Sequence, residues 1–236
     1  MSIYVIADLH LSFKNPKPMN IFGNNWENHE QKIKEDWQKK VTDDDLVILP
    51  GDFSWAMNLE DTYLDFKYLN ELPGKKILLK GNHDYWWTTM NKMREYIKVN
   101  EFDTIDFLYN NSYLFDGVIL TGTRGWTLND LEGEAKILNR ELGRLELSIN
   151  EGITKFGEDK PIYVFMHYPP ITNSAILNKS ELKFVEVMKK YKVQKCMYGH
   201  LHSHSHKDAI EGNIEGIEFN LISADYLDFK LMKIKQ

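Results

Sequence analysis

Short apolar runs of strand length alternate with amphipathic stretches through the first hundred residues. Three runs rich in Val, Ile and Leu are typical of buried β-strands and span residues 3–7, 46–49 and 76–80. Apolar residues then recur at helical spacing over residues 26–40, 59–72 and about 88–98. This alternation predicts a sheet of parallel strands covered by crossover helices.

The pattern changes after residue 105, where the apolar runs become shorter and lie closer together. We predict strands over residues 105–109, 113–115 and 118–121, joined as β-hairpins by Asn110-Asn111 and Asp116-Gly117. Further strands are predicted over residues 162–166, 195–198, 217–222 and 226–234, and helices over residues 130–150 and 180–191. Because each half of the chain contains helix-covered strands, we predict an α/β fold with two sheets packed face to face.

The composition is that of a folded globular protein. With 236 residues, 42% of them hydrophobic, the chain can form one large domain over residues 1–236 with a substantial core. The formal net charge of −6 argues against a nucleic-acid partner, since binding to a phosphate backbone needs clustered Lys and Arg. A single cysteine, Cys196, excludes an intrachain disulfide framework and is typical of a reducing compartment.

We expect neither a targeting segment nor a membrane segment from the apolar runs of the chain. The first apolar run begins at Ile3 with no basic leader before it, unlike a secretory signal peptide. No apolar run approaches the roughly 20 residues that a membrane span needs. We therefore expect a cytoplasmic protein without a membrane partner.

Side chains that can bind metal ions follow five of the predicted strands. They are Asp8, His10, Asp52, Asn82, His167, His200 and His202. Because the carboxyl ends of buried strands present side chains at one edge of a sheet, these residues could all point into one crevice. The set offers oxygen and imidazole nitrogen without thiolate, which suits manganese, iron or zinc and disfavours a structural zinc site.

Seven ligands are too many for one tetrahedral ion and suit two ions that share a bridging carboxylate. Two ions roughly 3.5–4 Å apart can clamp a phosphoryl group, and a hydroxide held between them would be the nucleophile. His83 follows Asn82 directly and could protonate the leaving alkoxide. Asp84 could then hold the His83 ring in the correct tautomer.

The chain resembles the calcineurin-like metallophosphoesterases. The resemblance rests on five motifs in order, namely Asp8-x-His10, Gly51-Asp52, Gly81-Asn82-His83-Asp84, His167 and Gly199-His200-x-His202. It spans nearly the whole chain and implies a four-layer α-β-β-α sandwich of two mixed β-sheets flanked by helices. It also implies the role of each residue. One metal would be bound by Asp8, His10 and His202, the other by Asn82, His167 and His200, and Asp52 would bridge the two. His83 would be a general acid with Asp84 as its partner.

The expected activity is hydrolysis of a phosphomonoester or a small phosphodiester at two divalent or trivalent metal ions. The substrate is then a small phosphorylated molecule, and the acidic balance of the chain argues against a nuclease. The alternative is a catalytically silent metal-binding or protein-interaction scaffold of the same fold. Such a protein would be expected to lose metal ligands or His83, and this chain retains all of them.

Other residues near these motifs allow two interpretations each. Arg124 follows the run at 118–121, where its guanidinium could bind a substrate phosphate bidentately or tie down a loop. Tyr85, Trp86 and Trp87 could form a stacking wall for the leaving group, but we expect at least two of them to pack in the core.

The histidine run continues past His202 to His204 and His206. In an extended segment these alternating residues would lie on one side. They could then bind a third metal ion, but exposed loop histidines are the preferred interpretation.

Overall fold

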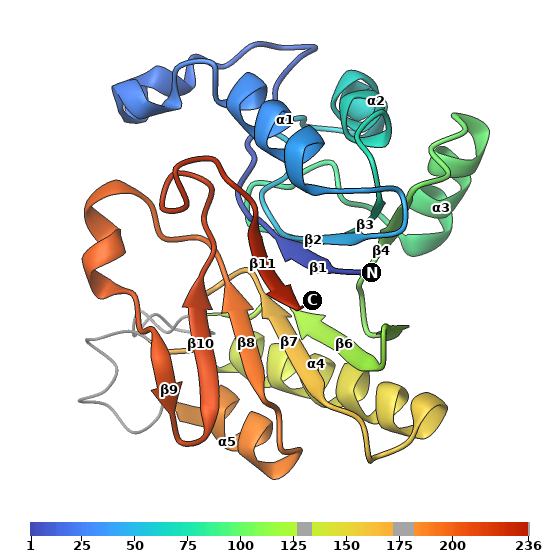
Figure 1. Ribbon diagram of the computed structural model, residues 1–236, viewed down its shortest axis with the longest axis vertical. Helices are drawn as coiled ribbons and strands as arrows, with labels where there is room; N and C mark the ends of the chain where they lie inside the picture. The colour runs from blue at the N-terminus through green and yellow to red at the C-terminus, as the bar shows by residue number, and fades with distance from the viewer. Residues whose placement is uncertain (127–133, 172–181, 236) are drawn as a thin grey trace.

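The computed structural model describes residues 1–126, 134–171 and 182–235, which form two mixed β-sheets flanked by helices. In the first sheet the strand order is β11-β1-β2-β3-β4 (Figure 1). These strands are β1 (Ile3–Val5), β2 (Leu46–Pro50), β3 (Lys75–Leu79), β4 (Ile105–Phe107) and β11 (Met232–Lys235). Strands β1 to β4 run parallel to one another, and β11 pairs antiparallel with β1.

The second sheet has the order β5-β6-β7-β8-β10-β9. Its strands are β5 (Tyr113–Phe115), β6 (Val118–Thr123), β7 (Ile162–Met166), β8 (Lys195–Tyr198), β9 (Gly212–Ile214) and β10 (Ile217–Leu221). The four central strands are parallel, whereas β5 and β9 are antiparallel edge strands. Both sheets are therefore mixed, as predicted.

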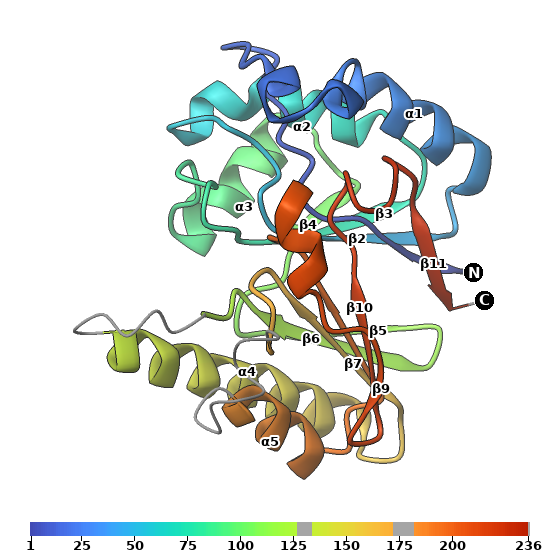
Figure 2. The same ribbon diagram turned by 90° about the vertical axis from the view of Figure 1, so that its left-hand side faces the viewer.

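Helices cover the outer face of each sheet, and Figure 2 shows the four layers in profile. Above the first sheet lie α1 (His29–Lys40), α2 (Tyr63–Asn70) and α3 (Met90–Val99). Below the second sheet lie α4 (Glu134–Phe156) and α5 (Lys183–Lys190). This arrangement confirms the predicted α-β-β-α sandwich. In the part of the chain that the structure describes, no helix has the length and apolarity to cross a membrane.

Alternate residues of the strands pack into different layers of the core. Val47 of β2 contributes to the cluster beneath α1 to α3, whereas Ile48 contributes to the cluster that joins the two sheets. In β7, Val164 belongs to the cluster that includes residues of α4 and α5, and Phe165 packs between the sheets. Because successive side chains point to opposite faces and both faces are buried, the strands read as continuous apolar runs.

One predicted strand pairing is wrong. Residues 105–109 were expected to form a hairpin with residues 113–115, but β4 pairs in parallel with β3 in the first sheet. The chain then crosses to the second sheet, where β5 and β6 form the remaining predicted hairpin. A short apolar run fits either sheet edge, so local pattern alone does not determine its partner.

Several element boundaries differ from the prediction for local reasons. Helix α1 begins at His29 rather than residue 26, because Asn28 has a left-handed φ of 52°. The segment 59–72 begins as a 3-10 turn, η3 (Leu59–Thr62), before α2. In the tail, Asp228 and Phe229 have positive φ angles, which delays the last strand to Met232.

Two predicted helices fall partly outside the described residues. Residues 130–133 and 180–181 lie outside the described ranges, and the helices there are described from Glu134 and Lys183. Helix α4 continues to Phe156, beyond the predicted end at residue 150.

Candidate metal centre

The carboxyl ends of the central strands of both sheets meet at one place and bring all seven predicted metal ligands together. Backbone hydrogen bonds fix the strand ends, as the amide of Asp8 donates to Gly51 O and the amide of His10 donates to Asp52 O, both over 3.0 Å. The two sheets are joined at this point because the amide of His200 donates to Asp8 Oδ2 over 2.9 Å. The sequence rule that polar residues follow buried strands therefore selected side chains that lie together in the fold.

The first group of donors consists of Asp8, His10 and His202. One ligand atom of each lies within 4.8 Å of the others. The distance from Asp8 Oδ1 to His202 Nε2 is 3.7 Å. Asp8 Oδ1, His10 Nδ1 and His202 Nε2 are buried and have no hydrogen-bond partner among the described residues. Buried polar atoms without partners are costly unless a ligand such as a cation binds them.

The second group consists of Asn82, His167 and His200. The Asn82 Oδ1 atom lies 2.6 Å from His167 Nε2 and 2.9 Å from His200 Nδ1, and the two ring nitrogens lie 3.3 Å apart. The other ring nitrogen of His167, Nδ1, lies 3.2 Å from the carbonyl oxygen of Pro50. A hydrogen bond from Nδ1–H to that carbonyl would leave Nε2 free to bind a metal ion.

Asp52 lies between the two groups. Its Oδ2 atom is 3.5 Å from His167 Nε2 in the second group and 3.9 Å from His10 Nε2 in the first. Its Oδ1 atom accepts a hydrogen bond of 2.8 Å from the amide of His83, which fixes the carboxylate in place. One oxygen of Asp52 therefore faces both groups, as a bridging ligand must.

The backbone is strained at this site. Four of the seven predicted ligands have a positive φ, namely Asp8, His10, Asp52 and His200. Such conformations are uncommon for residues with a side chain and concentrate at functional sites. Gly81 permits the close approach of the β2 and β3 loops, since a Cβ atom there would lie 2.2 Å from the backbone nitrogen of Asp52.

The electrostatics of the crevice also indicate a cation site. Burial, together with the neighbouring Asp8 carboxylate, raises the pKa of Asp52 to about 8. Burial would lower the pKa of His202, but the Asp8 and Asp225 carboxylates raise it to about 10. Burial and the neighbouring His167 lower the pKa of His200 to about 3. Two buried carboxylates with converging imidazoles and an amide oxygen form a donor set that fits two hard or borderline metal ions.

His83 lies beside the donors, between two aromatic side chains. Its ring centroid is 5.8 Å from that of His10, 4.4 Å from that of Trp55 and 6.2 Å from that of Tyr85. Burial, followed by the charge of His167, lowers the pKa of His83. The protonated ring is therefore a stronger acid than an exposed histidine.

The predicted hydrogen bond between Asp84 and the His83 ring is absent. His83 Nδ1 has no partner among the described residues, and the buried Asp84 carboxylate accepts five hydrogen bonds from other groups. Its donors are the amides of Asp52, Phe53, Ser54 and Gly81 and the indole N–H of Trp86. Asp84 thus ties the loop after β2 to the loop after β3, because it satisfies backbone donors of both.

Asp225 is a residue of the site that sequence reasoning missed. It is buried, and its Oδ1 atom accepts a hydrogen bond of 2.8 Å from His202 Nδ1. Its Oδ2 atom accepts one of 3.0 Å from the amide of Ser203. Because Nδ1 of His202 is engaged, Nε2 is left to face Asp8. Asp225 follows a predicted strand, so the rule that found the other ligands could have found it.

The remaining candidate residues divide between site and scaffold. The carbonyl of Arg124 accepts hydrogen bonds from the amides of His167 and Tyr168, and its guanidinium lies 5.0 Å from the Trp126 ring centroid. The backbone of Arg124 thus ties down the His167 loop, and a role of its side chain in substrate binding stays a prediction. Trp86 and Trp87 are buried, as expected for core residues.

The histidine run after residue 202 is helical rather than extended. It forms the 3-10 helix η6 (Ser203–Asp208), so His204 and His206 do not share one side of a strand. His204 is exposed, whereas His206 Nε2 lies 3.2 Å from Asp225 Oδ2. His206 therefore contacts the carboxylate that positions His202.

Comparisons with known proteins agree with this geometry. Residues 1–204 match the family model described as calcineurin-like phosphoesterase. Among curated proteins, no sequence matches the chain.

Several solved structures share the fold. A Thermus thermophilus protein, TT1561, superposes with a TM-score of 0.58 at 12% identity, covering 99% of this chain and 97% of that one. The phosphopantetheinyl hydrolase PptH of Mycobacterium tuberculosis gives 0.57 at 12% identity, over 99% and 95%. The Aquifex aeolicus protein AQ665, of unknown function, gives 0.50 at 20% identity, over 98% and 95%. At these identities the likeness concerns the fold.

Proposed function

The chain belongs to the calcineurin-like phosphoesterase family, and on this premise we propose that it hydrolyses a small phosphomonoester or phosphodiester at a centre of two metal ions. The observation that supports this most directly is the position of Asp52. One of its oxygens lies within 4 Å of an imidazole nitrogen of each donor group. A carboxylate shared in this way is what a pair of adjacent ions requires.

In this proposal Asp8, His10 and His202 hold one ion, Asn82, His167 and His200 hold the second, and Asp52 contributes to both. The candidate ions are Mn, Fe and Zn. When bound, they would lower the pKa of an attacking water and stabilise the negative charge on the phosphoryl oxygens. The two loops that contribute Asp52 and Asn82 are held at a fixed separation by Asp84. Preorganised ligands of this kind reduce the reorganisation that catalysis needs.

We assign His83 the role of general acid. Hydrolysis breaks the bond between phosphorus and the leaving oxygen and forms a bond from phosphorus to the oxygen of water. His83 would give its proton to the leaving oxygen and be reprotonated from solvent, while the proton released by the attacking water leaves the site. The location of the ring, beside His10 and partly exposed, supports this role.

We propose that the guanidinium of Arg124 contacts the substrate phosphate. It follows β6, the strand next to β7, and its backbone contacts the loop that carries His167. Lys80 lines the same small pocket as Arg124 and is a second cationic side chain there. A planar guanidinium can bind two phosphate oxygens at once.

Turnover of two chromogenic esters tests the proposal. Protein stripped with a chelator is assayed with p-nitrophenyl phosphate and bis-p-nitrophenyl phosphate after addition of manganese, zinc, iron or magnesium. Activity that returns with metal supports the proposal, and the ratio of the two rates separates monoesterase from diesterase. If two ions bind per chain and neither ester is hydrolysed, the result favours the silent scaffold.

A further inference from the structure

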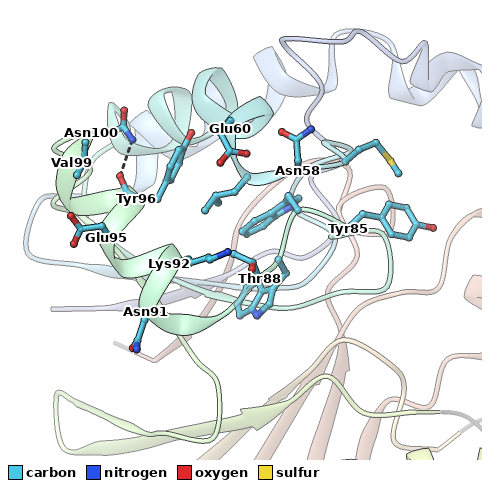
Figure 3. A pocket seen from close by; sticks show the side chains of 14 residues that line it. Asn58, Glu60, Tyr85, Thr88, Asn91, Lys92, Glu95, Tyr96, Val99 and Asn100 are labelled. Carbon is cyan, nitrogen blue, oxygen red and sulfur yellow. Dashed lines mark hydrogen bonds between the residues drawn. The ribbon is translucent and has the colours of Figure 1, made fainter.

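A groove of about 820 Å³ lies beside the candidate metal centre and takes no part in metal binding. One wall is formed by the start of η3 and the residue before it, which contribute Glu60 and Asn58. The other wall is helix α3, as Figure 3 shows. The volume falls in the range of about 300–1,000 Å³ that is typical of small-molecule sites.

The groove begins at Tyr85 and ends at Val99 and Asn100 (Figure 3). Helix α3 contributes Lys92, Tyr96 and Val99 to it, which are spaced three or four residues apart and so lie on one face. Ten helical residues rise by about 15 Å, so the groove can accept an elongated molecule.

One end of the groove adjoins the proposed reaction site. Tyr85, at one end, is also the aromatic neighbour of His83, with 6.2 Å between ring centroids. Its floor includes Trp86, whose indole N–H donates to Asp84 Oδ1 over 2.9 Å. The same carboxylate accepts a hydrogen bond of 2.9 Å from the amide of Asp52. A long leaving group on the His83 side would therefore reach the groove past the exposed ring of Tyr85.

The lining indicates what kind of group fits. Met57, Tyr85 and Val99 are 65%, 54% and 68% exposed, so large apolar surfaces are open to a ligand rather than buried in the core. Single exposed apolar residues are ordinary, but three along one groove form an apolar track. The hydroxyl of Thr88, which also lines the groove, offers hydrogen bonds.

Charge gives a further constraint. The charged residues of the lining are Glu60, Lys92 and Glu95, so acidic groups exceed basic groups by one. A leaving group with a distal phosphate or carboxylate would be repelled by these two glutamates. An uncharged group with apolar segments and some hydrogen-bonding atoms would be accommodated.

We infer that this groove binds the leaving group of the substrate, an elongated and uncharged amphipathic alcohol esterified to the phosphate. The inference rests on the proposed phosphoesterase function and extends it. The two groups of metal donors by themselves do not distinguish a long ester from a short one. Binding energy from the remote part of the alcohol would position the phosphoryl group for attack.

The test compares three phosphate monoesters by the release of their alcohols: ethyl phosphate, the monophosphate of decanediol and the monophosphate of hydroxydecanoic acid. The methyl diesters of the same alcohols are assayed in parallel. We expect kcat/KM to be at least tenfold higher for the decanediol ester than for the ethyl ester, and the carboxylate-bearing ester to lose most of that advantage.

Two substitutions on α3 provide the matched pair. Glu95→Trp fills the middle of the groove and should abolish the preference for the long ester while hydrolysis of ethyl phosphate is unchanged. Arg94→Trp places the same side chain at the neighbouring exposed position, outside the groove, and should preserve the preference. Equal kcat/KM for the short and long esters, or a preference that survives Glu95→Trp, would overturn the inference.

Failure of the proposed function gives a different result. If none of the esters is hydrolysed with any metal, the phosphoesterase proposal fails, and calorimetric binding of the decanediol monophosphate then tests the groove by itself. Binding weakened at least tenfold by Glu95→Trp and unchanged by Arg94→Trp would support the groove as a ligand site. Equal binding by all three proteins would contradict it.

Discussion

The Oδ1 atom of Asp225 accepts a hydrogen bond of 2.8 Å from Nδ1 of His202. This contact selects the tautomer of His202 that leaves Nε2 facing Asp8. Asp225 comes from the segment after β10, whereas His202 follows β8. The C-terminal part of the chain, beyond the residues that match the family model, thus contributes to the geometry of the site.

Asp225→Asn should weaken one of the two metal sites. Asparagine removes the charge and turns an N–H group toward the amide of Ser203 or the ring of His202, so His202 loses its fixed orientation. We expect affinity for one metal ion to fall about 10- to 100-fold, with the second ion unaffected. Calorimetric titration of the chelated protein with manganese measures both. The control is Asp228→Asn, which changes an exposed carboxylate three residues away and should leave the binding of both ions normal. Equal loss of affinity at both metal sites in Asp225→Asn would contradict the assignment.

His83→Ala should lower turnover without changing metal content. The loss should be about a hundredfold or more for an alkyl phosphate, because an alkoxide leaving group needs a proton. For p-nitrophenyl phosphate the loss should be much smaller, since p-nitrophenolate leaves without one. His204→Ala removes an exposed histidine of the same region and should change neither rate. Equal losses with both substrates would argue that His83 acts in another way.

Asp84→Asn should destabilise the fold. The carboxylate accepts five hydrogen bonds in a fully buried position, and an amide of the same shape turns two donors of its own toward these N–H groups. We expect the free energy of unfolding to fall by about 2–4 kcal/mol, measured by urea denaturation of the metal-free proteins. Asp44→Asn, at an exposed position, should change it by less than about 0.5 kcal/mol. If Asp84→Asn were as stable as the control, the carboxylate would not hold the two loops.

The different outcomes for Asp84 and Asp225 show what the sequence could predict. The gathering of the seven predicted donors could be foreseen because each follows an apolar run, and parallel strands align their carboxyl ends. The role of Asp84 was missed because three of its five partners are backbone amides of residues 52–54, about thirty positions earlier. Only the close approach of two loops at Gly81 brings those amides to it. Asp225 lies after a predicted strand, but its link to His202 depends on η6, which the sequence pattern did not indicate.

The pairing of β4 was mispredicted for a related reason. Residues 105–109 and 113–115 are both short strand-like runs that flank a turn-forming asparagine pair, which is the pattern of a hairpin. The structure uses that turn to pass from one sheet to the other. Periodicity reports which residues are buried, whereas the partner strand depends on packing of the whole domain.

Lys76 should make stability depend on pH in the alkaline range. Its side chain is buried, its ammonium donates hydrogen bonds to Leu72 O and Thr104 Oγ1, and burial lowers its pKa to about 8. Between about pH 8 and pH 10.5 the unfolded chain therefore binds a proton that the folded chain has lost, so folding becomes more favourable as pH rises. The free energy of unfolding of the wild-type protein minus that of Lys76→Met should rise by about 2 kcal/mol between about pH 7.5 and pH 10. Urea denaturation at the two pH values measures this, and a constant difference between the two proteins would contradict it.

The most direct test of the two-metal account is electron paramagnetic resonance of chelated protein reconstituted with manganese. If Asp52 bridges adjacent ions, the saturated protein should bind two manganese ions per chain and show the spectrum of an exchange-coupled pair, since bridged ions lie roughly 3.5–4 Å apart. Asp52→Ala should abolish the coupled spectrum. One ion per chain at saturation, or two ions with the spectrum of isolated manganese, would contradict the account.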